Sequence, residues 1–190
     1  MNKQKVLAIA LVVLLGALAI GGTSAYFTYS ERARNAITTS GIAIRLIEDT
    51  NEIGVDGRAV PFRNVDGVMP GDKISKIPKV VNIDEGDAYI RIKATVGATA
   101  SDGGQVVIPT SALNLDINTA KWTQNGDYYY YNDVLGANQT TEPLFTTVTI
   151  PENLSDLYQN TTFSLDIEAE AVQVVNNGAT ALEAQGWPEE

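Results

Sequence analysis

The side chains that could do chemistry in this chain are carboxylates, hydroxyls, amides and lysines, because the sequence contains no histidine and no cysteine. The missing residue types exclude a catalytic triad with a histidine base, a thiol nucleophile and a histidine-ligated zinc site. A carboxylate pair could still hydrolyse a glycosidic bond. The candidates lie in two acidic clusters, Glu48-Asp49 and Asp84-Glu85-Gly86-Asp87. Charge runs of this kind usually form hydrated loop surfaces, so the sequence favours a non-enzymatic protein with no cofactor and no catalytic metal.

The second acidic cluster also offers oxygen ligands of the kind that calcium binds, and so does Ser101-Asp102-Gly103-Gly104. Neither stretch has the ligand spacing of the 12-residue loop of an EF-hand. A structural calcium site is therefore an alternative that the sequence leaves open.

An aromatic block, Tyr128–Tyr131 with Trp122 nearby, could stack against a sugar ring. In a strand, alternation places two of these tyrosines on each face, so half of them are expected in the core. Aromatic residues are also ordinary strand formers that pair across hairpins. We therefore predict a structural hairpin here, with a carbohydrate-binding or adhesion module as the alternative function.

The first 25 residues have the three parts of a secretory signal. Two lysines precede the apolar run Val6–Ile20, and small residues follow it at Thr23-Ser24-Ala25. As a helix this run would rise only about 23 Å, short of the roughly 30 Å of a bilayer core. The pattern favours a signal peptide over residues 1–25 rather than a transmembrane anchor. Thr23 and Ala25 then precede the cleavage point, Tyr26 becomes the first mature residue, and only the uncleaved leader contacts the membrane.

Cleavage would leave residues 26–190 as a single domain, long enough to bury a sizeable core. The chain carries a formal net charge of −10, which becomes −12 when the two lysines of the leader are removed. This negative charge argues against nucleic acids and anionic membrane surfaces as partners. A cysteine-free exported chain of this size suits the surface of a Gram-positive bacterium.

Period-two alternation of apolar and polar residues dominates the mature chain and predicts antiparallel strands. The stretches that read as strands are Gly41–Glu48, Ala88–Val96, Leu113–Ile117, Leu144–Ile150 and Phe163–Ala171. The polar residues of the last run, such as Glu168 and Glu170, are expected on the solvent face. Many short strands separated by turns indicate an all-β fold, an antiparallel β-sandwich of jelly-roll type, preceded by a signal-peptide helix.

Turn signals separate the expected strands. Met69-Pro70-Gly71-Asp72 has proline and glycine at the central positions of a type II turn. Asn125-Gly126 lies between two strand-like stretches and predicts a hairpin. Asp49–Gly57 is expected to be a loop, and Ala179–Gln185 is the one stretch that could form a short helix.

Three parts of the chain together resemble the camelysin/TasA family of Gram-positive exported proteins. They are Gly21–Thr28 with Ile37–Leu46, Val68–Ser75 leading to Asp87–Lys93, and Glu142–Pro151 with Glu168–Gln173. The resemblance implies a jelly-roll sandwich, processing by a SipW-type signal peptidase, and a role in biofilm-matrix or surface fibres beside other matrix components. Camelysins are also described as metalloendopeptidases. This chain has no histidine and hence no HExxH motif, so that activity is not carried over.

The resemblance also implies how the subunits join, with the segment freed by cleavage entering the sheet of the next subunit as a donated strand. Here that segment is Tyr26-Phe27-Thr28-Tyr29-Ser30. A short strand is not stable alone in water, but it can pair with an open sheet edge. Head-to-tail donation that does not close gives a filament. The alternative, equally compatible with the residues, is that this segment forms the first strand of its own sandwich.

Overall fold

The computed structural model describes residues 29–30, 33–35, 42–65, 68–99, 104–107, 113–152 and 162–188. The strands are β1 (Tyr29–Ser30), β2 (Ala33–Asn35), β3 (Ile44–Ile53), β4 (Ala59–Pro61), β5 (Lys73–Ser75), β6 (Ile77–Asn82), β7 (Ala88–Thr99), β8 (Gln105–Val107), β9 (Asn114–Leu115), β10 (Trp122–Asn125), β11 (Tyr128–Tyr131), β12 (Thr147–Thr149) and β13 (Thr162–Gln173). Within these ranges there is no helix, and hence none that could cross a membrane. The expected signal-peptide helix and the cleavage residues Thr23, Ala25 and Tyr26 lie outside the described residues.

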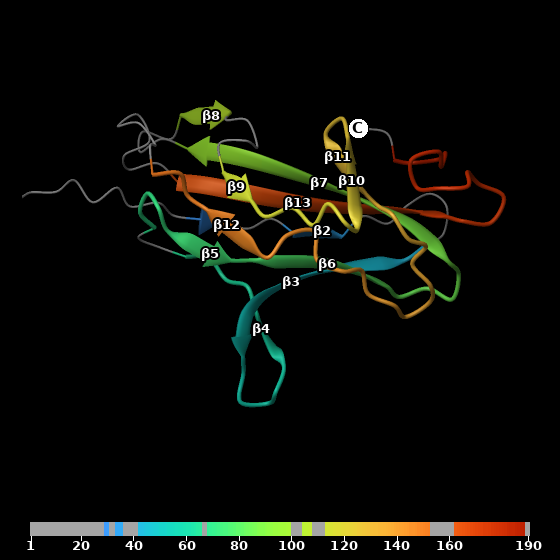
Figure 1. Ribbon diagram of the computed structural model, residues 1–190, viewed down its shortest axis with the longest axis horizontal. Helices are drawn as coiled ribbons and strands as arrows, with labels where there is room; N and C mark the ends of the chain where they lie inside the picture. Colours follow the sequence, from blue (N-terminus) through green and yellow to red (C-terminus); the bar gives the residue numbers. More distant parts are fainter. Residues whose placement is uncertain are drawn as a thin grey trace, which may run out of the picture.

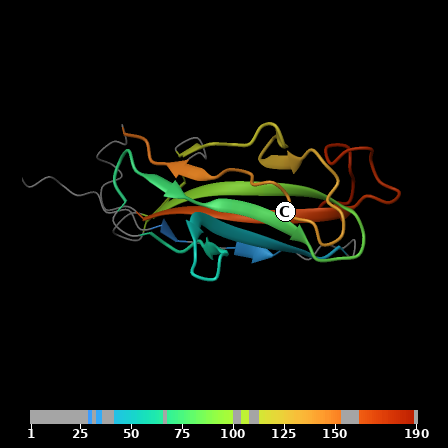
Figure 2. The ribbon, with the colours of Figure 1, turned by 60° about the horizontal axis from the view of Figure 1, so that its bottom comes forward.

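The largest sheet has seven strands in the order β1-β13-β7-β11-β10, with β2 also beside β13 and β8 beside β7. Its centre is the long antiparallel pair of β7 and β13, in register from Thr99 opposite Thr162 to Ala88 opposite Gln173. Both strands run along the long axis of the molecule (Figures 1 and 2). The hairpin of β10 and β11 extends this sheet beyond β7.

A second layer consists of two three-stranded sheets, β4-β3-β6 and β5-β12-β9. The two sheets are adjacent along the chain, because only Lys76 separates β5 from β6. The chain then alternates between the layers, with β6, β9 and β12 in the second and β7, β10, β11 and β13 in the first. Such repeated crossing is typical of jelly-roll connections.

The core lies between the two layers and is lined by the apolar residues of the alternating strands. Its buried members include Ile44, Leu46, Val80, Ile92, Val96, Phe145, Val148, Leu165 and Ile167. On each long strand these residues recur at every second position, as the period-two pattern requires. The antiparallel β-sandwich predicted from the sequence is confirmed.

The two turn signals are also confirmed, one of them with a shift. In the Met69–Asp72 turn, Gly71 has φ of +90° and the Asp72 amide donates to the Met69 carbonyl at 3.0 Å. In the β10–β11 hairpin, Asn125 pairs with Tyr128, so Gly126 and Asp127 form the turn rather than Asn125 and Gly126. Gly126 has φ of +61°, and glycine at the first central position is what a type II′ hairpin turn needs.

The expectation of a loop over Asp49–Gly57 is wrong for Asp49–Ile53, which belong to a strand, and right for residues 54–57, which form the turn that follows. Strand β3 continues to Ile53, and the chain returns as β4, with Ile53 opposite Ala59. This hairpin, residues 50–61, projects away from the body of the sandwich, and we call it the arm (Figure 1). The alternation that predicts half-buried strands is absent here because an arm surrounded by water has no buried face.

The expectation of a short helix at Ala179–Gln185 is also wrong. The stretch makes a single turn, in which the Ala184 amide donates to the Thr180 carbonyl at 3.0 Å. It belongs to residues 174–188, which we call the C-terminal segment. After β13 this segment turns at one end of the molecule and packs on the outer face of the largest sheet (Figures 1 and 2).

Candidate functional site

The first candidate is the edge of β13, where the beginning of the chain meets its last strand. Of the predicted donor segment, Tyr26, Phe27 and Thr28 lie outside the described residues. The backbone of Tyr29 and Ser30 forms β1, which pairs in parallel with Phe163 and Ser164 of the same chain. The structure thus presents the arrangement in which the segment pairs within its own sandwich.

Strands β1 and β2 share one register along β13. Tyr29 pairs with Phe163 and Asn35 pairs with Ala169, so both pairs are separated by 134 residues. A constant separation means that β1 and β2 follow the same line along the β13 edge. They are parallel to β13, whereas every other strand pairing in this sheet is antiparallel within the described residues. Strands β1 and β2 are therefore added in parallel at the margin of an otherwise antiparallel sheet.

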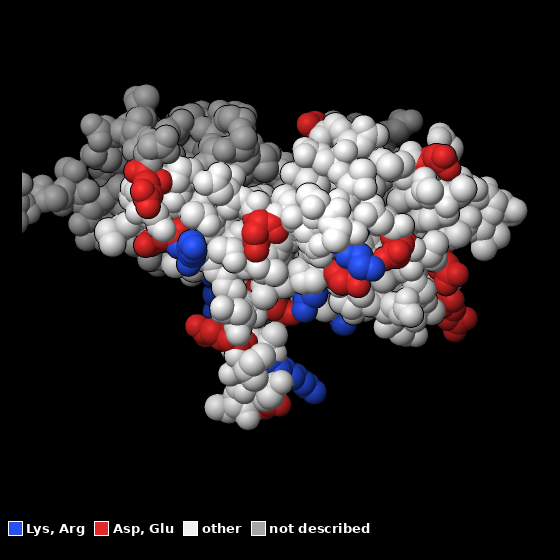
Figure 3. Space-filling view, in the orientation of Figure 1, with Lys and Arg blue, Asp and Glu red and all other residues white. Residues whose placement is uncertain are grey.

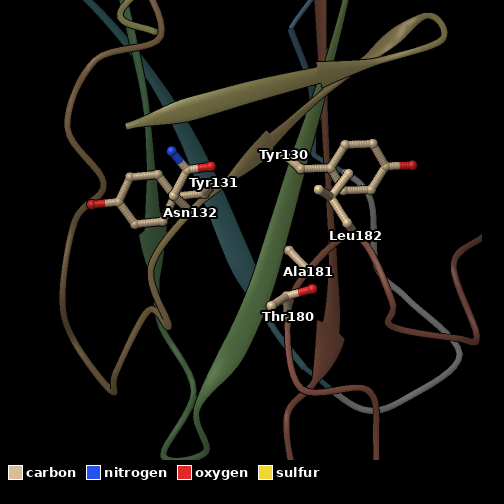
Figure 4. A pocket seen from close by; sticks show the side chains of 6 residues that line it. All are labelled: Tyr130, Tyr131, Asn132, Thr180, Ala181 and Leu182. Carbon is tan, nitrogen blue, oxygen red and sulfur yellow. The ribbon is translucent and has the colours of Figure 1, made fainter. Parts of the chain in front are cut away.

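The second candidate is the aromatic hairpin, in which alternating tyrosines lie on opposite faces of β11. Figure 4 shows the Tyr130 and Tyr131 rings on opposite sides of the strand. Tyr131 is buried in the main core, 5.0 Å from the ring of Trp122, and its hydroxyl donates to Glu142. Tyr129 packs against the same core, and burial raises its pKa. Two of the four tyrosines are thus core residues, as predicted.

The other two tyrosines surround Arg91 on the outer face of the largest sheet. The Arg91 guanidinium carbon lies 3.8 Å from the centroid of the Tyr128 ring and 4.7 Å from that of Trp187. Arg91 Nε donates to Glu170 Oε2 at 2.5 Å, and Nη1 donates to the Tyr130 hydroxyl at 3.3 Å. In this cluster the rings of Tyr128 and Trp187 pack against the Arg91 guanidinium, and both aromatic side chains are half-buried.

The expectation that Glu170 faces solvent is wrong, because only 5% of the residue is exposed. The C-terminal segment covers it, and Arg91 Nη2 donates to the Pro188 carbonyl at 3.3 Å. Burial raises the pKa of the Glu170 carboxyl, and the hydrogen bond from Arg91 opposes that shift. This cluster could not be predicted from the sequence because it depends on contacts between residues far apart in the chain. Trp187 folds back onto a strand about a hundred positions earlier.

A small cavity lies between the hairpin and the C-terminal segment (Figure 4). Its volume is about 110 Å³, and its lining residues are Tyr130, Tyr131, Asn132, Thr180, Ala181 and Leu182. Sites for small molecules usually measure roughly 300–1,000 Å³. The cavity between the hairpin and the C-terminal segment is smaller than such sites.

Two of the candidate carboxylates, those of Glu48 and Asp84, make contacts that hold the fold together. Glu48 is buried, with Oε1 2.5 Å from the Nζ atom of Lys76. Asp84 accepts hydrogen bonds from the backbone amides of Glu85 at 2.6 Å and Ala43 at 3.1 Å. These two bonds lower the pKa of Asp84 below its usual 3.8. Each of these side chains therefore has a structural role in the loops or strands where it lies.

The part of the chain that the structure describes does not show an arrangement of ligands that would support the calcium alternative. Within those ranges, no three acidic, histidine or cysteine side chains gather where they could hold a metal ion. Ser101, Asp102 and Gly103 lie outside the described residues.

The Met69–Asp72 turn fixes the start of β5 to the end of β12. The Gly71 amide donates to the Ile150 carbonyl, and the Ile150 amide donates to the Asp72 carbonyl, each at 2.9 Å. Asp72 Oδ2 also accepts a hydrogen bond from the Met69 amide at 2.8 Å. These contacts give the turn a structural role within the second layer.

Comparison with known proteins adds little. No protein-family model matches the chain, and no curated protein matches it. Among solved structures, the ASH/PapD-like domain 7 of human CEP192 is similar, with a TM-score of 0.30 and 6% identity over 82% of this chain and 88% of that domain. At this TM-score the likeness carries no argument about the present chain.

Proposed function

We propose that this chain is a secreted structural protein, a subunit of extracellular or biofilm-matrix fibres that assembles head-to-tail by donating its N-terminal strand. The observation that carries the proposal is the position of β1 and β2, which lie along the margin of the β13 edge in a single register. A strand that pairs on one side only can be replaced by the same strand from another copy. The resemblance of the sequence to the camelysin/TasA family supports the same assembly.

The contacts alone do not decide whether the N-terminal strand pairs with its own copy or with another copy. A donated strand forms the same backbone hydrogen bonds with the β13 edge of a neighbour as with its own β13, because the two edges are identical. Concentration then decides the outcome, since pairing between copies grows with concentration and pairing within a copy does not. Each subunit that gives its strand away offers an empty β13 edge, so the contact repeats without closing and yields a filament.

The leader would control this exchange. While residues 1–25 remain attached, their apolar run would hold the donor segment at the membrane. Cleavage after Ala25 by a SipW-type signal peptidase would release Tyr26 and the strand behind it. The proposed setting is the surface or matrix of a Gram-positive bacterium, and the proposed role is not enzymatic.

Engineered cysteines provide a direct test, because the natural chain has none. Ser30 pairs with Ser164, and cysteine differs from serine in a single atom of the side chain. Chains that begin at Tyr26 and carry either Ser30→Cys or Ser164→Cys are unfolded, mixed, refolded and oxidised. Strand donation predicts a disulfide between the two kinds of chain, seen as a doubled mass on a non-reducing gel.

A matched control replaces Ser164→Cys by Thr123→Cys on β10, at the opposite margin of the same sheet. That mixture should give no more disulfide-linked dimer than random collisions between the chains produce. If the Ser30 and Ser164 chains remain separate while a chain with both cysteines closes within itself, the N-terminal strand stays in its own sandwich and the proposal fails.

Electron microscopy tests the consequence for assembly. Chains that begin at Tyr26 should form fibres, whereas chains that keep residues 1–25 or lack Tyr26–Ser30 should remain folded and single. Fibres from chains without Tyr26–Ser30 would show that another contact joins the subunits.

A further inference from the structure

Two asparagines of this chain are followed directly by glycine, in Asn125-Gly126 and Asn177-Gly178. In such a pair the backbone amide nitrogen of the glycine can attack the side-chain carbonyl carbon of the asparagine and close a five-membered ring. Glycine favours this reaction because it has no Cβ atom to obstruct the approach and adopts backbone angles that other residues avoid. By sequence the two pairs are equal candidates for self-modification, but their surroundings in the fold differ.

The Asn125-Gly126 pair lies at the exposed end of the β10–β11 hairpin. Asn125 closes the hairpin opposite Tyr128, and it is exposed to solvent together with Gly126 and Asp127. Apart from the neighbours in the chain, a Cβ atom on Gly126 would meet nothing within 4 Å, so the space over the turn is open. Among the described residues, no hydrogen bond engages the Gly126 amide or the Asn125 side chain. Both reacting groups can therefore approach each other in water.

The Asn177-Gly178 pair is held by hydrogen bonds in the C-terminal segment. Asn177 Nδ2 donates to the carbonyls of Gln173 at 2.9 Å and Gln185 at 3.1 Å. Asn177 Oδ1 accepts from the amides of Gly178 and Gln185, each at 2.8 Å. The backbone of Gly178 also packs closely on that of Glu183, because a Cβ atom on this glycine would lie 2.5 Å from the Glu183 backbone carbon. The attacking nitrogen and the leaving amide are thus both engaged, and closing the ring would break these bonds.

We infer that Asn125 is a site of spontaneous covalent modification and that the fold protects Asn177 from the same reaction. At Asn125 the Gly126 amide nitrogen gives its proton to hydroxide and forms a bond to Cγ, the Cγ–Nδ2 bond breaks, and Nδ2 leaves as ammonia. Water then opens the resulting succinimide at either of its two carbonyl carbons, which leaves aspartate or isoaspartate at position 125. The net reaction consumes one water and releases one ammonia, so it requires no other reactant. It depends on the hairpin alone and takes place whether or not the chain forms fibres.

The modification changes both the charge and the backbone at this margin of the largest sheet. Either product adds one negative charge beside Asp127, in a chain whose formal net charge is −10 and whose acidic side chains are spread over the face shown in Figure 3. Isoaspartate also lengthens the main chain between positions 125 and 126, where a two-residue hairpin turn requires a defined backbone geometry. The other end of the hairpin is held by Trp122 and Tyr131, whose ring centroids are 5.0 Å apart. We expect the tip of the hairpin to open while its base stays paired, so the modification records the age of a molecule without unfolding it.

The test follows both asparagines in the folded chain by mass spectrometry. The purified chain is kept at mildly alkaline pH in water enriched in heavy oxygen, and samples taken over weeks are digested in ordinary water. Peptides that contain position 125 should show conversion to aspartate and isoaspartate, with heavy oxygen in the new carboxyl group as the sign that the reaction preceded digestion. The rate of conversion at Asn125 should exceed the rate at Asn177 by about tenfold or more. A rate at Asn125 that does not exceed the rate at Asn177 would overturn the inference, whether both asparagines react or neither does.

The same chain unfolded in guanidinium chloride is the matched control, because unfolding removes the contacts of Asn177 and leaves the sequence unchanged. In the unfolded chain the two asparagines should react at similar rates, so unfolding should accelerate the reaction of Asn177 by about tenfold or more and change that of Asn125 much less. If the difference between the two rates persisted in the unfolded chain, the neighbouring sequence and not the fold would be its cause, and the protection assigned to the C-terminal segment would be wrong.

Discussion

Lys76 Nζ lies 2.5 Å from Oε1 of Glu48, and at most 4% of either side chain is exposed. The pair joins β3 to the single residue that separates β5 from β6. Two sheets of the second layer and the base of the arm therefore meet at one buried ion pair.

Replacing Lys76→Met should lower the free energy of unfolding by about 3–5 kcal/mol, because it takes the ammonium away from a buried carboxylate. Urea denaturation followed by circular dichroism measures the change. The control is Lys79→Met, which breaks the partly exposed pair with Asp49 at 2.8 Å and should cost about 1 kcal/mol or less. Equal losses for the two variants would mean that burial does not set the strength of the inner pair.

Trp187→Ala should loosen the C-terminal segment. The Trp187 ring lies over Arg91 and meets the Tyr130 ring edge-on at 5.8 Å, so its removal should cost about 1–3 kcal/mol. Hydrogen exchange should show faster exchange over residues 174–188 and no change in β7. Leu182→Ala, at a residue that is 44% exposed, is the control and should leave the exchange rates as they are. Unchanged protection in Trp187→Ala would contradict the packing described.

Gly178→Ala should disturb the same segment by a different cause. A Cβ atom at this position would lie 2.5 Å from the backbone carbon of Glu183 and 2.8 Å from the amide nitrogen of Ala184. The backbone must move to make room, at a cost of about 1–3 kcal/mol, which thermal unfolding should record as a lower midpoint.

The matched control for this glycine is Gly86→Ala, where the added Cβ would make an ordinary 3.5 Å contact with Ile42. Its midpoint should stay close to that of the natural chain. A Gly178→Ala midpoint equal to the control would show that the segment has more room than the structure gives it.

Asp116 should contribute to stability in a pH-dependent way. Burial raises its pKa, but hydrogen bonds from the Thr146 hydroxyl and from the amides of Thr146 and Thr147 outweigh burial and bring the pKa below 3.8. A carboxyl whose pKa is lowered by folding stabilises the fold above its unfolded pKa, and this contribution disappears as the pH falls through the folded pKa.

Asp116→Asn should therefore unfold at lower urea than the natural chain near neutral pH, and it should lose less stability between about pH 5 and pH 2. Urea midpoints across that range measure both effects. Asp127→Asn in the exposed β10–β11 turn is the control. If Asp116→Asn lost as much stability on acidification as the natural chain, the Thr146 and Thr147 contacts would not be the cause.

The sandwich could be predicted from the sequence because the alternation of apolar and polar residues along its strands shows which side chains are buried. In β7 and β13 every second residue lies in the core, and this periodicity is visible without any knowledge of the partner strand. The Gly71 and Gly126 turns were equally readable, since each needs a positive φ that glycine adopts at little cost.

The parts that could not be predicted depend on distant contacts or on the lack of contact. Glu170 reads as a solvent-facing charge until Trp187 and Pro188 cover its neighbour Arg91. The arm reads as a loop because water surrounds it on both faces, so its residues carry no alternation. The pairing of β1 with β13 of its own chain could not be predicted, because in the strand donation that we propose β1 would pair with a β13 edge of the same sequence on another copy.

The 134-residue span between Tyr29 and Phe163 also affects when β1 can pair with β13. In the proposed export, the first strand would emerge long before the last one and would wait without a partner while the body of the sandwich forms, because closing so long a loop is slow. Under the proposed strand donation, strands from chains already outside would compete for each new β13 edge during that delay, at a rate that rises with their number. A cell that exports many copies at one place would thereby link them in the order in which they leave.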